Sequence, residues 1–129
     1  VGLATVELGK AMGAKVIAAA SSAGKLAVAK EAGADELINY TNEPLKDAVK
    51  KLTKSKGVDV IYDPVGGDFT EQALRAMAWN GRHLIIGFAA GAIPKIPAHL
   101  PLLTGCSLFG VLWCRFPQRE PAASAPTLL

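Results

Sequence analysis

The sequence has few cysteines, few histidines and no long uninterrupted apolar run. Two cysteines among 129 residues argue against a disulfide framework, and two histidines argue against a Cys/His metal cluster. Cys106 and Cys114 lack metal-ligand spacing, so we expect free, buried thiols in a reducing compartment. The most apolar tract, residues 100–113, is short and interrupted by proline and glycine, which argues against a membrane span.

Aromatic residues are also scarce, and the net charge is small. Aromatics make up 6% of the chain, and 14 Lys and Arg against 11 Asp and Glu leave a net charge of +3. Most of this excess lies in residues 46–56, where no aromatic residue interleaves the lysines as a stacking surface would require. We interpret the stretch as a solvated helix face and expect no nucleic-acid partner. No signal-peptide pattern occurs, so we expect a cytoplasmic protein without a membrane partner.

Half of the residues are apolar, enough to bury the core of one domain. Strand-like and helix-period segments alternate, which is typical of βαβ units with a parallel sheet covered on both faces. The sequence therefore predicts a doubly wound α/β domain over residues 1–116, followed by a disordered tail over residues 117–129. The expected strands are 15–20, 37–38, 58–62, 82–86 and 107–112, and the expected helices are 1–12, 23–32, 45–56 and 69–77.

Apolar spacing also predicts the buried faces of the helices. The expected face of the first helix is Val1, Ala4, Leu8, Ala11 and Met12, and that of the third is Leu45, Ala48, Val49 and Leu52.

Gly2 comes directly before the first apolar helix. In a dinucleotide-binding fold a glycine turn joins the first strand to the first helix, whose N-terminus faces the pyrophosphate. Gly2 occupies the place of the last glycine of that loop. Taken alone it is weak evidence, because a glycine before a helix is more often an ordinary turn.

The end of the expected strand 15–20 carries the more specific signal. A fold that selects NAD places an acid near this point to bind the ribose 2′-hydroxyl. Here Ser21 and Ser22 follow the strand, and Lys25 lies in the first turn of the next helix. A lysine there opposes the helix dipole unless a bound anion reverses the local charge. The residues therefore favour NADP(H) over NAD(H).

Several short motifs together resemble one known family. They are the runs at residues 2–10, 13–18, 32–35, 38–40 (Ile-Asn-Tyr) and 63–67 (Asp-Pro-Val-Gly-Gly). Over residues 1–116 the chain is similar to the zinc-independent quinone oxidoreductase branch (zeta-crystallin-like) of the medium-chain dehydrogenase/reductases. This resemblance implies a Rossmann-type domain and hydride transfer from NADPH to a quinone or an α,β-unsaturated carbonyl.

The resemblance also implies a role for particular residues. Lys25, with Ser21 and Ser22, matches the site of the 2′-phosphate, and Tyr40 matches a tyrosine against the adenosine end, although a half-buried strand-end aromatic explains Tyr40 nearly as well. The nicotinamide end would be approached by two loops. The residues of these loops that match the family are Val65 and Gly66 in the first, and Gly87, Phe88 and Ala89 in the second. We expect no catalytic residue and no metal ligand within this chain.

The chain departs from the family pattern at both ends. The first, central strand of the usual sheet order is missing, as is the amino-terminal substrate domain. We therefore expect a fragment that is unstable alone, or whose strands 15–20 and 58–62 close up, or whose empty position is filled by another segment. The apolar edge at residues 107–112 is expected to form a homodimer seam.

Two alternatives remain open at this point. A Rossmann-type methyltransferase would share the architecture, although it usually requires an acid at the end of the second strand. A truncated chain that only binds nucleotide or only dimerises would explain the missing parts.

Overall fold

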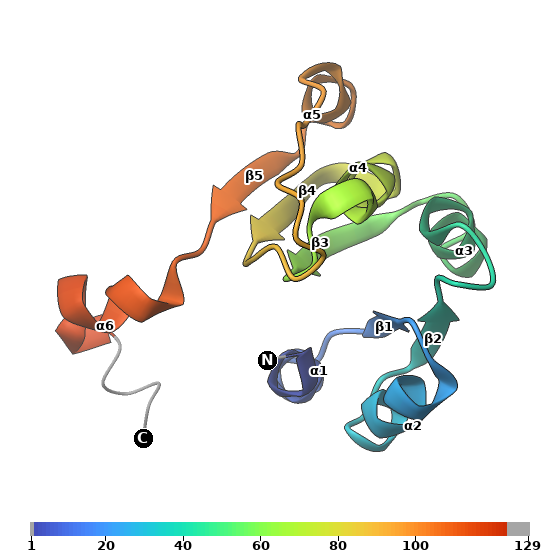
Figure 1. Cartoon of the computed structure of the whole chain (residues 1–129), viewed down its shortest axis with the longest axis horizontal. Coiled ribbons are helices and arrows are strands. Elements are labelled where there is room, and N and C mark those ends of the chain that lie inside the picture. The colour runs from blue at the N-terminus through green and yellow to red at the C-terminus, as the bar shows by residue number, and fades with distance from the viewer. Residues whose placement is uncertain (1, 124–129) are drawn as a thin grey trace.

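The computed structural model describes residues 2–123 and contains two parallel sheets (Figure 1). Strand β1 (Ile17–Ala20) pairs with β2 (Glu36–Asn39). Strands β3 (Val58–Asp63), β4 (Met77–Ile85) and β5 (Ser107–Gly110) form the second sheet in that order. In the described residues no strand links β1 to β3, so the order is β2-β1, an interruption, and β3-β4-β5. This confirms the predicted α/β class and the missing central strand.

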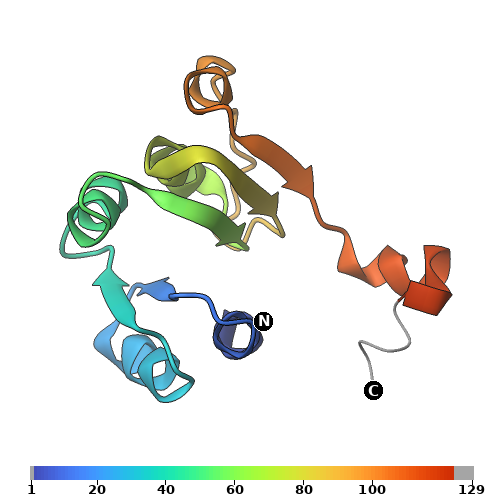
Figure 2. The ribbon, with the colours of Figure 1, turned by 180° about the vertical axis from the view of Figure 1, so that it is seen from behind.

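The helices are α1 (Gly2–Ala11), α2 (Ala23–Glu31), α3 (Leu45–Leu52), α4 (Gly67–Arg75) and α5 (His99–Thr104), followed by a 3₁₀ turn (Trp113–Arg115) and α6 (Phe116–Arg119). Helices α2 to α5 connect successive parallel strands, whereas α1 precedes the first strand and α6 follows the last (Figure 2). The chain places β2 on one side of β1 and then crosses through α3 to start β3 beyond the interruption. The strand order therefore reverses at the interruption, which is where open α/β sheets bind ligands.

One core cluster spans the interruption. Ala48 and Val49 of α3 pack with Ile38 of β2, and partly buried Ile17 and Val58 join them from β1 and β3. Because α3 contacts strands of both sheets, it holds them together without hydrogen bonds between β1 and β3. The predicted apolar stripe of α3 is confirmed, and the alternative in which the two strands close up is not observed.

A second cluster covers the opposite face of β1 and β2. It joins Val6 of α1 and Ala29 of α2 to Ala18 and Leu37. Adjacent residues of a strand point to opposite faces, so Ile17 enters the first cluster and Ala18 the second. The β1–β2 sheet is therefore covered on both faces, as predicted, whereas in the β3-β4-β5 sheet Val60 is 45% exposed and all four residues of β5 are exposed.

Some details predicted from the sequence are wrong. Val1 of the expected face of the first helix lies outside the described residues, and the rest of that face is exposed, with Leu8 at 62% and Met12, just after α1, at 84%; Val6 is buried instead. Strand β4 begins at Met77, inside the expected fourth helix, and its register against β3 shifts around Asn80, which has a φ of 58°. Both cysteines are free, but Cys114 is exposed where burial was expected.

The predicted domain boundary stays a prediction. Helix α6 crosses the expected boundary between residues 116 and 117, and residues 124–129 of the expected tail lie outside the described part of the chain. No helix of residues 2–123 is long and apolar enough to cross a membrane.

Candidate functional site

Ser21, Ser22 and Lys25 lie together where β1 passes into α2. Ser22 is the N-cap, and its Oγ accepts a hydrogen bond from the backbone N–H of Lys25 at 3.3 Å. The Lys25 Nζ donates to the Ser21 Oγ at 3.5 Å. The first turn of α2 carries no acid. A helix N-terminus, a hydroxyl and an ammonium group thus converge without an internal counter-charge, which suits an anion such as a phosphate.

Tyr40 lies directly after β2 and is half-buried. Its ring packs against that of Phe69 in α4, with 4.5 Å between the ring centroids. This is the structural role that a strand-end aromatic was expected to have, and it leaves the adenosine contact a prediction.

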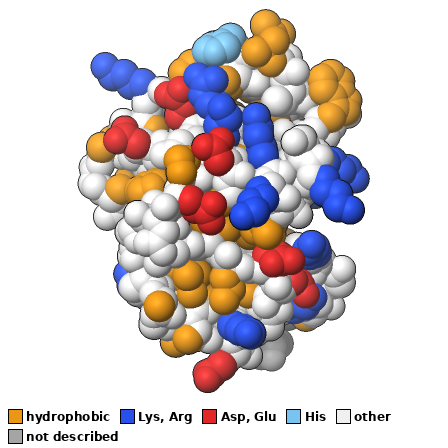
Figure 3. Space-filling view, turned by 90° about the vertical axis from the view of Figure 1, so that its right-hand side faces the viewer, with side chains coloured by type: hydrophobic (Ala, Val, Ile, Leu, Met, Phe, Trp, Pro, Cys, Tyr) orange, Lys and Arg blue, Asp and Glu red, His pale blue; other side chains and the backbone are white. Residues whose placement is uncertain are grey.

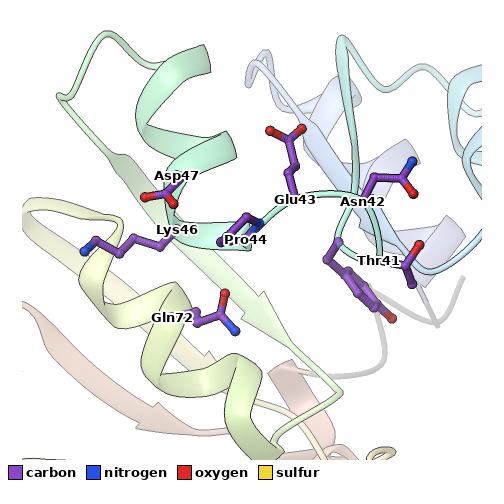
Figure 4. Close-up of a pocket in the computed structure, with 8 residues that line it drawn as sticks. Thr41, Asn42, Glu43, Pro44, Lys46, Asp47 and Gln72 are labelled. Carbon is purple, nitrogen blue, oxygen red and sulfur yellow. The ribbon is translucent and has the colours of Figure 1, made fainter.

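Tyr40 also lines an open hollow of about 510 Å³ between the loop after β2, α3 and α4 (Figure 4). Gln72 of α4 lies on one side, where its Oε1 accepts a hydrogen bond from the Leu45 N–H at 3.0 Å. Glu43, Lys46 and Asp47 give the hollow both signs of charge. None of the other predicted site residues lines it, so the hollow and the predicted site meet only at Tyr40.

The wider face around α3 shows no basic patch. Figure 3 shows Lys and Arg side chains interspersed with Asp and Glu on the side of the molecule that carries α3. Ala48 and Val49 are the buried residues of that helix, so Lys50 and Lys51 in its last turn lie on its outer side. Helix α3 ends at Leu52, so Lys54 and Lys56 follow the helix instead of lying on it, and the expected helix over residues 45–56 is too long at its C-terminal end.

The turn after β3 is held by the carboxylate of Asp63. Its Oδ1 accepts hydrogen bonds from the backbone N–H groups of Val65, at 3.0 Å, and Gly66, at 2.9 Å. Gly66 has a φ of 72°, and a Cβ there would lie 2.9 Å from the Phe88 Cδ1. Glycine is therefore required at position 66 both by its backbone conformation and by the neighbouring loop.

Backbone hydrogen bonds join this turn to the loop after β4. The N–H of Ala89 donates to the Pro64 carbonyl at 3.0 Å, and that of Gly87 donates to the Asp63 carbonyl at 3.4 Å. Phe88 is 41% exposed, so it lies outside the core. The structure thus brings together all five residues that were expected near the nicotinamide: Val65, Gly66, Gly87, Phe88 and Ala89.

A buried polar group behind the turn was not expected from the sequence. The Asp63 Oδ2 accepts a hydrogen bond from the Thr70 Oγ1 at 2.7 Å and lies 3.1 Å from the His83 Nε2. Burial alone would raise the pKa of Asp63. Hydrogen bonds from His83, Gly66, Thr70 and Val65 outweigh that effect and hold the pKa well below its usual value of 3.8. An Asp before Pro and Gly at a strand end is a turn signal that could have revealed part of this group.

The structure gives no local reason for glycine at Gly2. It is the first residue of α1 and is exposed, and an added Cβ would meet no atom within 4 Å. The predicted residues therefore form three groups: Ser21, Ser22 and Lys25 after β1, Tyr40 after β2, and five residues after β3 and β4. Gly2 stands apart at the start of α1.

Comparison with known proteins gives a consistent result. A family model described as zinc-binding dehydrogenase matches residues 1–127. Quinone oxidoreductase-like protein 2 homolog from Nematostella vectensis is 46% identical over 121 residues, covering 93% of this chain and 33% of that relative. The chain thus spans about a third of the length of the curated relatives it matches.

Solved structures give the same family. Escherichia coli quinone oxidoreductase complexed with NADPH matches 98% of this chain and 40% of its own, with a TM-score of 0.81 and 30% identity. A 2-haloacrylate reductase matches 82% of this chain and 33% of its own, with a TM-score of 0.73 and 31% identity.

The residues present do not fit a zinc site, although the family description mentions zinc. Among residues 2–123 no group of three or more His, Cys, Asp and Glu side chains could hold a metal ion. His83 faces Asp63 inside the sheet, and no third such ligand joins that pair. No chemical step is therefore assigned to zinc in this chain.

Proposed function

The chain belongs to the zinc-binding dehydrogenase family as a quinone oxidoreductase-like member of the medium-chain dehydrogenase/reductases, and on this premise we propose that it is the NADP(H)-binding part of an oxidoreductase. The observation that carries the proposal is the Ser21–Lys25 pair at the N-terminus of α2, with no acid in the first turn. The residues fit a cofactor that bears a phosphate on its ribose, because an ammonium group and a hydroxyl converge there.

The other groups provide for the rest of the cofactor. Tyr40 would lie against the adenosine, and the N-terminus of α1 at Gly2 would face the pyrophosphate. Val65 and Gly66 would contact the nicotinamide ribose, and Gly87, Phe88 and Ala89 would approach the nicotinamide. Bound NADPH supplies the hydride, and the residues of this chain bind and orient the ring.

The substrate class is part of the proposal. The protein that contains this chain would transfer hydride to a quinone or to an α,β-unsaturated carbonyl compound. Support comes from the relatives, whose names include quinone oxidoreductase and 2-haloacrylate reductase. Residues that bind the substrate or donate a proton would lie outside this chain. A cytoplasmic location and independence from zinc stay predictions.

A titration of the full-length protein with NADPH, NADH and S-adenosylmethionine tests the proposal. We expect NADPH to bind tightest, and Lys25→Ala to weaken NADPH binding about tenfold or more, because a charge-assisted hydrogen bond is lost. NADH binding should change little. Lys30→Ala is the matched control, since Lys30 lies in the last turn of the same helix. Binding of none of the three ligands would support the non-enzymatic alternative, and binding of S-adenosylmethionine alone would support a methyltransferase.

A further inference from the structure

His83 is completely buried, with 0% of its surface exposed, in the middle strand of the three-stranded sheet. Its backbone pairs with Ile61 of β3 on one side and with Leu108 of β5 on the other. A buried polar side chain is costly unless it forms hydrogen bonds. The Nε2 atom of His83 lies 3.1 Å from the Asp63 Oδ2, whereas its Nδ1 is buried and forms no hydrogen bond within the described residues. The proton facing the carboxylate is therefore on Nε2.

The two oxygens of Asp63 have different partners. Oδ2 accepts hydrogen bonds from the side chains of Thr70 in α4 and His83 in β4, whereas Oδ1 faces the turn after β3. The N–H groups of Val65 and Gly66 in the turn both donate hydrogen bonds to Oδ1. The two bonds at Oδ2 therefore orient the carboxylate so that Oδ1 can hold the turn.

A movement of the turn after β3 would also displace the loop after β4. Gly66 packs so closely on Phe88 that an added methyl group would lie 3.3 Å from its Cα. The same two segments share the hydrogen bonds that Gly87 and Ala89 donate to carbonyls of residues 63 and 64. A rotation of the Asp63 carboxylate would thus displace both loops, and Ser21 and Lys25 take no part in this network.

We propose that His83 is a positioning residue, which acts through Asp63 to set the two loops that would receive the nicotinamide half of the cofactor. This inference rests on the proposed function. His83 cannot contact the cofactor, because none of its surface is exposed. Its effect is confined to one end of the site, because the network reaches Val65, Gly66 and Phe88 and not the group after β1.

Comparing two ligands tests this proposal in the full-length protein. NADPH would span both ends of the site. In contrast, 2′,5′-ADP is adenosine with a 2′- and a 5′-phosphate and has no nicotinamide half. For His83→Leu, which removes the donor to Asp63, we expect the Kd for NADPH to rise about tenfold. We expect the Kd for 2′,5′-ADP to change less than about twofold, because Ser21 and Lys25 are untouched. His83→Gln, whose amide nitrogen can replace Nε2 as a donor, should recover most of the NADPH affinity.

Thr70→Val provides a second variant that keeps the inference falsifiable if His83→Leu does not fold. It removes the other hydrogen bond to Oδ2, and it should weaken NADPH binding in the same selective way. Equal losses for both ligands, or no loss for NADPH in either variant, would overturn the positioning role. If the unsubstituted protein bound neither ligand, the proposed function itself would fail, and the inference would fail with it.

Discussion

The ring of Tyr40 packs on the ring of Phe69, with an angle of 47° between the two planes. Tyr40 follows β2, and Phe69 lies in the helix that follows β3. The pair therefore links two sheets that share no strand pairing in the described residues. Together with the Leu45–Gln72 hydrogen bond and the cluster around α3, it carries the connection across the interruption.

A double-mutant cycle on this pair should show coupling. We expect Tyr40→Leu and Phe69→Leu each to destabilise the chain, and the double variant to lose less than the sum. The difference should be about 0.5–1.5 kcal/mol, the usual value for an aromatic pair beyond its burial. Urea unfolding of the four proteins measures it. Strict additivity would show that the two sheets are held together by other contacts.

Two glycines should respond to alanine in opposite directions. Gly66→Ala should destabilise the chain by about 1–3 kcal/mol, because a side chain is forced into a positive φ and against Phe88. Gly24→Ala should stabilise it by about 0.4–1 kcal/mol, since Gly24 lies in α2 with no atom within 4 Å of an added Cβ. Thermal or denaturant unfolding compares them. Similar effects of the two substitutions would contradict the close contact at Gly66.

Acid should weaken the chain partly through Asp63. The pKa of Asp63 is lowered in the folded state from its ordinary value of 3.8, so the folded state binds a proton less readily than the unfolded chain does. The stabilisation is complete well above that value and is lost as the pH falls below it. Free energies of unfolding measured between pH 7 and pH 3 should converge for the unsubstituted protein and Asp63→Asn. Thr70→Val removes one hydrogen bond from the carboxylate and so raises the pKa of Asp63 in the folded state; the loss of stability should therefore be smaller and should be complete at a higher pH.

Local signals allowed much of this structure to be predicted from the sequence. The stripe of α3 is buried as expected, because it depends on residues within one or two turns. The resemblance assigned the five residues of the loops after β3 and β4 to one end of the cofactor, and these loops do meet because parallel strands bring their carboxyl ends to one edge. The resemblance to a known family then predicted that these loops bind a cofactor.

What failed depends on contacts between distant parts of the chain. Leu8 and Met12 have the spacing of a buried face, but among the described residues nothing covers them, whereas Val6 packs on the second cluster. The Asp63–His83 contact joins residues 20 positions apart, and no spacing rule within one element indicates such a pair. Sequence periodicity shows that a face is apolar, and only the fold shows what covers it.

The outer edge of β5 is an open strand edge within the described residues. All four residues of β5 are exposed, and among the described residues β5 pairs only with β4. Phe109 is 46% exposed on this edge. An apolar open edge is a ready template for strand pairing, so we propose the homodimer seam expected from residues 107–112.

Sedimentation of the full-length protein should show a dimer that Phe109→Lys weakens at least about tenfold. The lysine removes an apolar side chain whose burial is worth about 1.5–3 kcal/mol and places a charge next to its own copy across the two-fold axis. Met12→Lys is the matched control, because Met12 is 84% exposed and lies just after α1, away from β5 (Figure 1). A monomer at every concentration would rule out the seam. Equal weakening by both substitutions would instead indicate non-specific apolar association, because a seam at β5 predicts that only the substitution at position 109 weakens the dimer.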